Sequence, residues 1–293
     1  MKRINLVFVL LSFYLILFGQ NNEKLLIGGC GWNKIAIIDK TTKTIEWEHV
    51  FFNREDCNDL QLTSDGNILY AYNRGARLVN MNHEVIWDFK VNKGEELFTA
   101  RQLKNGRYLL AMCGHPARIV EINKKGKVVK SKVFDTGIKS VHGQFRQLTV
   151  KKDGGYIIPL MGKGEVIETN KKMEIIRRVK CGGNPFSVFV TKEGKWMVSC
   201  GDGHKLVYIN PNDGQITDTI DSSSFENLSM NFVAEALVYE NENTLFCNWN
   251  GHTKDKSQPL LVEFDSDKKI VWTLYPSEDI VNISAVFSFF SPI

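Results

Sequence analysis

The feature that most constrains the fold of this chain is an internal repeat. Five blocks of similar pattern follow one another, and each contains four short runs rich in Val, Ile, Leu and Tyr, separated by turns. The equivalent turn residues are spaced 40, 48, 40 and 49 residues apart, and they are Gly66, Gly106, Gly154, Gly194 and Asn243. After the first twenty residues no stretch keeps the i, i+3, i+4 spacing of an amphipathic helix. Four-stranded units of this period predict the blades of a β-propeller.

The two ends of the chain complete the ring. Residues 25–50 supply three runs that match the second, third and fourth strands of a blade, and residues 282–290 supply the missing innermost strand. The sequence therefore predicts an all-β protein, a six-bladed β-propeller of four-stranded blades, closed by the C-terminal strand joining the N-terminal blade. A single blade exposes two apolar faces, so packing between two neighbours is needed to bury both. The shared blade also removes an open sheet edge.

The N-terminus has the order of residues found in secretory signal peptides. Lys2 and Arg3 precede a largely apolar run over residues 4–18, which Gly19 and Gln20 follow. The run is shorter than the roughly 20 residues that span a bilayer as a helix. We therefore expect a signal peptide over 1–20 and a single propeller domain over 21–293, periplasmic or secreted, soluble and monomeric. An uncleaved N-terminal anchor is the alternative.

Composition excludes several classes of protein. Hydrophobic residues make up 43% and charged residues 24% of the chain, as in ordinary globular domains. There are 37 Lys and Arg against 33 Asp and Glu, and two of the positive residues lie in the expected signal peptide. A mature chain this close to neutral gives no electrostatic reason to expect a nucleic-acid partner.

The six cysteines fall into two groups. Four recur near the same place in successive repeats and are expected to be held apart, reduced and buried, because a disulfide needs Cα atoms within about 7 Å; they are Cys30, Cys113, Cys200 and Cys247. Cys57 and Cys181 lie in connecting loops, from which either is able to bridge a nearby strand cysteine. The pattern leaves that pairing open.

One block carries a more specific pattern. Its residues are Asp59, Leu60, Gln61, Leu62, Asp65, Gly66, Asn67, Ile68 and Leu69, then Val85, Ile86 and Trp87, and the closing Trp recurs at Trp47 and Trp272. This pattern resembles blades of the arylsulfotransferase-like and pyrroloquinoline-quinone-like (PQQ-like, quinoprotein-like) propellers. In arylsulfotransferase-like blades a His often opens the innermost strand, whereas the openings here hold Asn58, Thr99, Arg146, Phe186 and Glu235. The resemblance thus implies kinship of architecture.

The candidate site lies on one face of the ring. Loops between blades and loops joining second to third strands emerge together there, and we call this the loop face. The candidate ligand-binding residues are Trp32, Asp59, Arg74, Arg101, Arg146, His204, Glu235 and Trp249. Indole rings suit stacking on a ligand, and guanidinium groups suit carboxylate, sulfate or phosphate. The competing interpretations are Trp packing between blades and a structural ion pair between Arg146 and Glu235.

These residues favour a binding or scaffold module that holds a small polar ligand, carbohydrate-like or anionic, without a cofactor. The alternative is an enzyme, a group transferase or a lyase or hydrolase acting on a carbohydrate or aryl ester, with His142, His115 and Arg146 as catalytic candidates. A protein-interaction platform is a third hypothesis. A metal centre built from the loop histidines is not assigned, because their spacing matches no short motif; they are His115, His142, His204 and His252.

Overall fold

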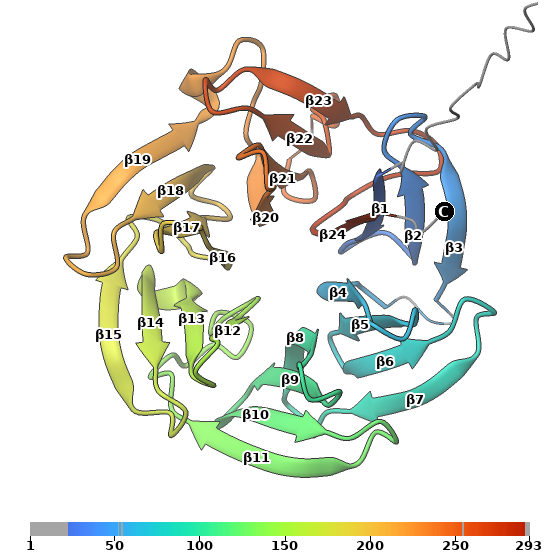
Figure 1. Cartoon of the computed structure of the whole chain (residues 1–293), viewed down its shortest axis with the longest axis vertical. Helices are drawn as coiled ribbons and strands as arrows, with labels where there is room; N and C mark the ends of the chain where they lie inside the picture. Colours follow the sequence, from blue (N-terminus) through green and yellow to red (C-terminus); the bar gives the residue numbers. More distant parts are fainter. Residues whose placement is uncertain (1–22, 52, 54, 254, 291–293) are drawn as a thin grey trace, which may run out of the picture.

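The computed structural model describes residues 23–290, except residues 52, 54 and 254. In this part of the chain, 24 strands form six four-stranded antiparallel sheets arranged around a central axis (Figure 1). This arrangement confirms the predicted six-bladed propeller. No helix among these residues has the length and apolar character needed to cross a membrane. The predicted signal peptide lies outside the described residues.

Blade 1 combines both ends of the chain, and blades 2 and 3 each consist of four consecutive strands. From the axis outward, blade 1 consists of β24 (Ala285–Phe290), β1 (Glu23–Gly28), β2 (Lys34–Asp39) and β3 (Ile45–Val50). Blade 2 consists of β4 (Asp59–Leu62), β5 (Ile68–Tyr72), β6 (Gly75–Val79) and β7 (Val85–Lys90). Blade 3 consists of β8 (Glu96–Gln102), β9 (Tyr108–Cys113), β10 (Ala117–Ile122) and β11 (Val128–Phe134).

The other three blades follow in chain order. Blade 4 consists of β12 (Thr149–Val150), β13 (Tyr156–Leu160), β14 (Glu165–Thr169) and β15 (Ile175–Lys180), with a 3-10 turn η1 (Met161–Lys163). Blade 5 consists of β16 (Ser187–Val190), β17 (Trp196–Ser199), β18 (Lys205–Ile209) and β19 (Ile216–Asp221), followed by η2 (Ser222–Ser224). Blade 6 consists of β20 (Phe232–Val238), β21 (Thr244–Trp249), β22 (Leu261–Phe264) and β23 (Ile270–Leu274).

Blade 1 is closed as the sequence predicts. β24 pairs with β1 along its whole length, from Glu23 opposite Phe290 to Gly28 opposite Ala285. The innermost strand of this blade therefore comes from the C-terminal end of the chain and the other three from the N-terminal end. With this pairing, every blade of the ring has four strands.

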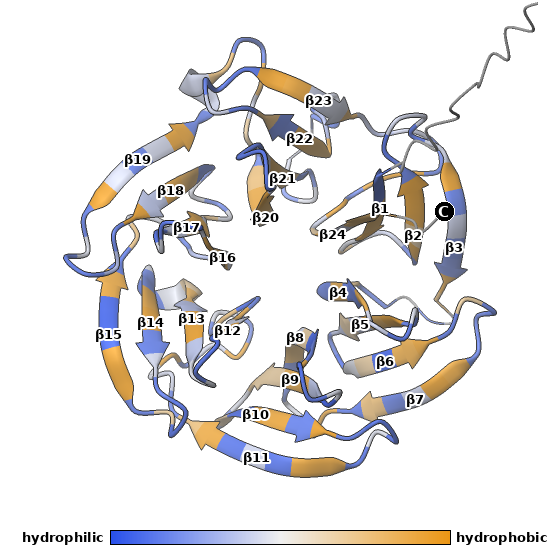
Figure 2. Ribbon diagram, viewed as in Figure 1, coloured by the Kyte–Doolittle hydropathy of each residue, from blue (hydrophilic) through white to orange (hydrophobic). Residues whose placement is uncertain are grey.

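Six apolar clusters fill the spaces between neighbouring blades. In one of them Leu26 and Ile37 of blade 1 pack with Leu60 and Tyr70 of blade 2, and all four side chains are buried. Middle strands such as β5 and β9 are buried along their length because both of their faces meet another blade. Outermost strands such as β11 and β15 carry alternating apolar and hydrophilic segments (Figure 2).

The recurring Trp residues attach blades to one another. Nε1 of Trp47 in blade 1 donates to the carbonyl of Met81 in blade 2 at 2.9 Å, and Nε1 of Trp272 in blade 6 donates to the carbonyl of Lys40 in blade 1 at 2.9 Å. The turn that the repeats share requires a left-handed residue, which glycine adopts without strain; φ is +74°, +75°, +85° and +81° at Gly66, Gly106, Gly154 and Gly194. In blade 6 Glu242, at φ 70°, takes this position, and not the predicted Asn243.

Candidate functional site

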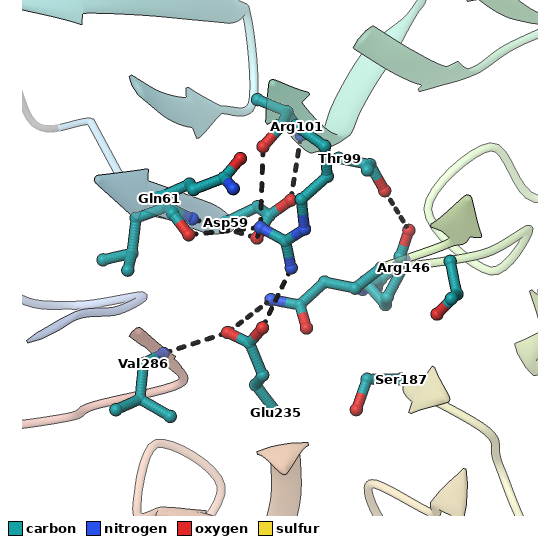
Figure 3. Close-up of polar contacts among 12 residues, drawn as sticks. Asp59, Gln61, Thr99, Arg101, Arg146, Ser187, Glu235 and Val286 are labelled. Atoms are coloured by element: carbon teal, nitrogen blue, oxygen red, sulfur yellow. Dashed lines mark hydrogen bonds and ion pairs between the residues drawn. The ribbon is translucent and has the colours of Figure 1, made fainter. Parts of the chain in front are cut away.

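The centre of the ring is crossed by a polar network with residues from five of the six blades. Arg101 on β8 donates through Nη1 to the carboxylate of Asp59 on β4, and through Nη2 to Oε1 of Glu235 on β20 at 2.9 Å (Figure 3). Nε2 of Gln147 and the backbone N–H of Val286 donate to Oε2 of Glu235 at 3.2 and 2.9 Å. One guanidinium therefore holds two carboxylates that come from different blades.

This network corrects one expectation. The ion pair that Glu235 makes is with Arg101 and not with Arg146. Asp59 is fully buried, and its carboxylate also accepts from the backbone N–H groups of Leu60 and Ala100, each at 2.9 Å. Burial raises the pKa of Asp59 and of Glu235, and the positive charge of Arg101 opposes the shift. Because its polar groups are paired with one another, the network stabilises the ring and leaves few groups for a ligand.

Arg146 differs from Arg101 in its partners. Its residue exposure is 7%, its guanidinium lies 4.1 Å from the centre of the Phe98 ring, and its Nη1 donates to the backbone carbonyls of His142 and Phe145. Within the described part of the chain it makes no ion pair with a carboxylate; the charges of Glu96 and Asp202 reach it only at longer range. Burial lowers the pKa of Arg146, but a guanidinium stays protonated at neutral pH.

Two histidines on the loop face are each oriented by a carboxylate. Nδ1 of His142 lies 2.8 Å from Oε2 of Glu96, and Nδ1 of His252 lies 2.8 Å from Oδ1 of Asp202. Since an ionised carboxylate only accepts hydrogen bonds, Nδ1 carries a proton in both pairs, and in the neutral imidazole Nε2 then has a free lone pair. Both imidazoles are exposed at the surface. Their two carboxylates, Glu96 and Asp202, are those whose charge reaches Arg146.

The remaining loop candidates make other contacts. Nε2 of His115 contacts the carbonyl of Lys139 at 2.9 Å, Nδ1 of His204 contacts the carbonyl of Asn231, and both residues are exposed. Arg74 is exposed in the turn between β5 and β6. The catalytic candidates His115 and His142 are thus held by different loops, and of the two only His142 contacts Arg146, through its carbonyl.

The two Trp candidates pack against the core. Trp32 is 4% exposed and its Nε1 donates to the carbonyl of Asp279 at 3.1 Å. Trp249 packs on the same apolar cluster, and its Nε1 donates to the carbonyl of Cys30 at 2.9 Å. Both indoles therefore help to join blade 6 to blade 1, and Trp249 also presents its ring edge to His252, with 4.7 Å between ring centres.

The cysteines and the loop histidines show no metal-binding arrangement. Among the residues that the structure describes, no group of three or more His, Cys, Asp or Glu side chains is placed to hold a metal ion. All six cysteines are free thiols, and Cys30 is only partly buried, unlike the prediction, because it follows β1 in a turn. Away from the loop face, a groove of about 1190 Å³ crosses blades 4 to 6 and is lined by charges of both signs.

The sequence places Glu96 in a loop between blades on the loop face, but it does not identify Glu96, Phe98 or Gln147 as ligand-binding or catalytic candidates. Glu96 opens β8, the strand that carries Arg101, and it contacts His142, which is 46 residues away in sequence, at 2.8 Å. Phe98 and Gln147 carry no signal of their own, since apolar and amide residues occur along every innermost strand.

The fold and site define a six-bladed β-propeller whose loop face carries a buried cation and two histidine–carboxylate pairs. A model of the Mal s 1 allergenic protein-like family matches residues 29–269. The chain therefore belongs to the Mal s 1-like family; the finer resemblance to arylsulfotransferase-like and PQQ-like propellers is not confirmed. Comparison with curated proteins gave no match.

Solved structures agree with this architecture. A protein of unknown function from Bacteroides caccae is 37% identical, with a TM-score of 0.86 over 91% of this chain and 98% of that chain. A catalytically inactive virginiamycin B lyase from Staphylococcus aureus with quinupristin is 13% identical, with a TM-score of 0.61 over 94% of both chains. A nidogen/laminin complex matches at 11% identity, with a TM-score of 0.66 over 91% of this chain and 98% of that chain. The last two similarities show the fold alone.

Proposed function

We propose that this protein is an exported binding propeller that holds a small anionic, carbohydrate-like ligand at the loop-face end of its axis. The observation that carries the proposal is the environment of Arg146. A largely buried charge without a counter-ion is costly, because water solvates only part of it. Arg146 keeps its charge and meets only two backbone carbonyls through Nη1. An anion supplies the missing counter-charge.

The other guanidinium nitrogens of Arg146 are available to such an anion. They make no hydrogen bond within the described residues, and none of them is among the buried polar atoms that lack a partner. They therefore reach solvent. A carboxylate, sulfate or phosphate accepts from a guanidinium through two parallel hydrogen bonds, which gives both strength and orientation.

The rim supports a ligand that also carries hydroxyl groups. Nε2 of His142 and of His252 are free to accept, while Glu96 and Asp202 fix the two rings. The basic, apolar and small residues at the N-terminus support export, because that order is read as a secretory signal. Fractionation of cells that express the full chain, with mass spectrometry of its N-terminus, tests the export half of the proposal: a chain that stays in the cytoplasm with an intact N-terminus contradicts it.

Isothermal titration tests the ligand half of the proposal. The probes are sulfate, phosphate, glucuronate and glucose, each titrated into the full mature chain. We expect measurable binding of glucuronate and no binding of glucose. Arg146→Met should weaken binding by about 10- to 100-fold, the range for hydrogen bonds to a charged group. Lys93→Met, an exposed residue in the loop between β7 and β8 on the same face, is the control; equal affinities in the two variants contradict the proposal.

A second candidate function is supported by the His142–Glu96 pair. A carboxylate that orients a histidine is the arrangement used by general bases, and Nε2 of His142 is free to take a proton. The corresponding activity is a group transferase, or a lyase or hydrolase acting on a carbohydrate or aryl ester. Turnover of nitrophenyl esters and glycosides, lost in His142→Gln and retained in His115→Gln, would establish it. No turnover of these substrates by the unmodified chain, together with unchanged glucuronate affinity in His142→Gln, favours the binding module.

A further inference from the structure

Two cysteines from neighbouring blades lie together at the boundary between blade 4 and blade 5. Cys181 follows β15 and Cys200 follows β17, and both are fully buried. They belong to the same apolar cluster, which also includes Val179 and Val198. The thiol of Cys181 contacts the backbone carbonyls of Gly164 and Gly183 at 3.4 and 3.3 Å, and the thiol of Cys200 lies 3.8 Å from the carbonyl of Val198.

The backbone between them is shaped for this approach. Sγ of Cys181 lies 3.3 Å from the carbonyl oxygen of Gly183. A Cβ added to Gly183 would lie 2.9 Å from Cβ of Cys200 and 3.2 Å from its Sγ, so any larger residue would push the two segments apart. The glycine therefore keeps the Cys181 loop against Cys200.

The other thiols have different partners. Sγ of Cys113 contacts the carbonyl of Phe145 at 3.4 Å, Sγ of Cys57 contacts the carbonyl of Asp59 at 3.6 Å, and Sγ of Cys30 contacts Oδ1 of Asn58 at 3.5 Å. Within the described residues, Cys181 and Cys200 share one apolar cluster between two blades, whereas Cys57, Cys113 and Cys247 each lie in a different cluster.

We propose that Cys181 and Cys200 are a disulfide-forming pair that becomes oxidised when the protein meets a disulfide oxidant, linking blade 4 to blade 5. The two side chains pack in one apolar cluster, and Gly183, whose carbonyl contacts Cys181, lies directly against Cys200, which brings the two cysteines together as a disulfide requires. This inference does not depend on the ligand proposed for Arg146.

The two thiols have different roles in the oxidation. The interaction with the thiol of Cys200 lowers the pKa of Cys181, while the same interaction and burial raise the pKa of Cys200. Cys181 is therefore the attacking thiolate. It displaces one thiol from the oxidant and forms a mixed disulfide, and Cys200 then loses its proton, attacks the Cys181 sulfur and releases the second thiol. Two protein thiols become one disulfide, and one oxidant disulfide becomes two thiols.

The disulfide would also fix part of the loop face. Gly201 and Asp202 directly follow Cys200, and Gly201 exchanges two backbone hydrogen bonds with Val233 of blade 6, at 2.9 and 3.1 Å. Asp202 is the carboxylate that orients His252. Oxidation therefore anchors the segment that positions one of the two histidine–carboxylate pairs.

Peptide mapping tests the proposal. The folded mature chain is incubated with oxidised glutathione, blocked with N-ethylmaleimide under denaturing conditions and digested with trypsin. Cleavage after Lys180, Lys192, Lys195 and Lys205 separates peptides 181–192 and 196–205. We expect these two peptides to be linked, while the cysteines outside them are alkylated. Alkylation of both Cys181 and Cys200 after incubation, or linkage to another cysteine, overturns the proposal.

A second measurement detects a disulfide that forms during folding, before the two thiols are buried and hard for an oxidant to reach. The chain secreted through its own leader is trapped with acid and alkylated, so that a bond formed during folding is seen. Reductant should lower the Tm of the oxidised chain and of Cys113→Ser, and should leave the Tm of Cys181→Ser unchanged. An equal effect of reductant on all three proteins contradicts the assignment.

Discussion

Replacing Arg101 by methionine tests how the ring is held together at its axis. The substitution keeps much of the side chain's length but removes the cation that Asp59 and Glu235 share. Removing one partner of a buried ion pair costs about 3–5 kcal/mol, because the charge left behind is neither solvated nor paired. At about 2 °C per kcal/mol for a chain of this size, the Tm should fall by roughly 6–10 °C at pH 8.

The loss should depend on pH in a definite direction. Burial already raises the pKa of Asp59 and Glu235 above their unfolded values, and Arg101 limits the shift. A carboxyl with a raised pKa contributes stability that is fully present below its unfolded pKa and lost as pH rises through its folded pKa. Without Arg101 both folded pKa values rise further. The loss of Tm in Arg101→Met should therefore be smallest near pH 4 and grow toward pH 8.

Thermal unfolding followed by circular dichroism at pH 4 to 8 gives the measurement. Arg107→Met is the matched control, because Arg107 lies on the same blade, is half exposed, and pairs with Glu121 at 3.3 Å. A surface pair contributes about 1 kcal/mol or less, so this control should shift the Tm by roughly 2 °C at most. A pH-independent loss in Arg101→Met, or one no larger than in Arg107→Met, refutes the reasoning.

Other substitutions separate packing from binding. Arg146→Met should change the Tm by less than about 2 °C, because an apolar group replaces a buried charge that has no ion-pair partner; a loss as large as that of Arg101→Met contradicts this. Trp32→Ala should lower stability by about 3–5 kcal/mol and leave glucuronate affinity unchanged, since its ring is core; lost affinity at full stability assigns it to the ligand. Deleting residues 285–293 removes β24 and should unfold blade 1, so an unchanged melting curve argues against the closure.

The ring could be predicted from the sequence because every blade needs the same features, apolar strands that pack on both faces and short turns between them. Apolar runs and a left-handed turn recur at Gly66, Gly106, Gly154 and Gly194, so one interpretation applies to every block. Three unpaired runs at one end and one at the other then predict the shared blade. The predicted turn of blade 6 is one residue too late, because Asn adopts the left-handed conformation more readily than Glu, yet Glu242 takes that position in the structure.

The candidate site was less predictable because its contacts cross the axis. Asp59, Arg101 and Glu235 come from different blades, and which arginine reaches Glu235 depends on how far each innermost strand advances along the axis. The strand that follows Arg146 is only two residues long, so Arg146 lies in irregular backbone beside His142 and not opposite Glu235. Burial of Trp32 likewise follows from how blade 6 meets blade 1, which no single repeat reveals.

Anomalous diffraction from crystals soaked in selenate tests the central claim, that Arg146 provides an anion site on the loop face. The account predicts a selenium peak within hydrogen-bonding reach of the Arg146 guanidinium, between His142 and His252, and loss of that peak in Arg146→Met. Ordered selenate elsewhere on the surface, together with a guanidinium that meets only the carbonyls of His142 and Phe145, would contradict it.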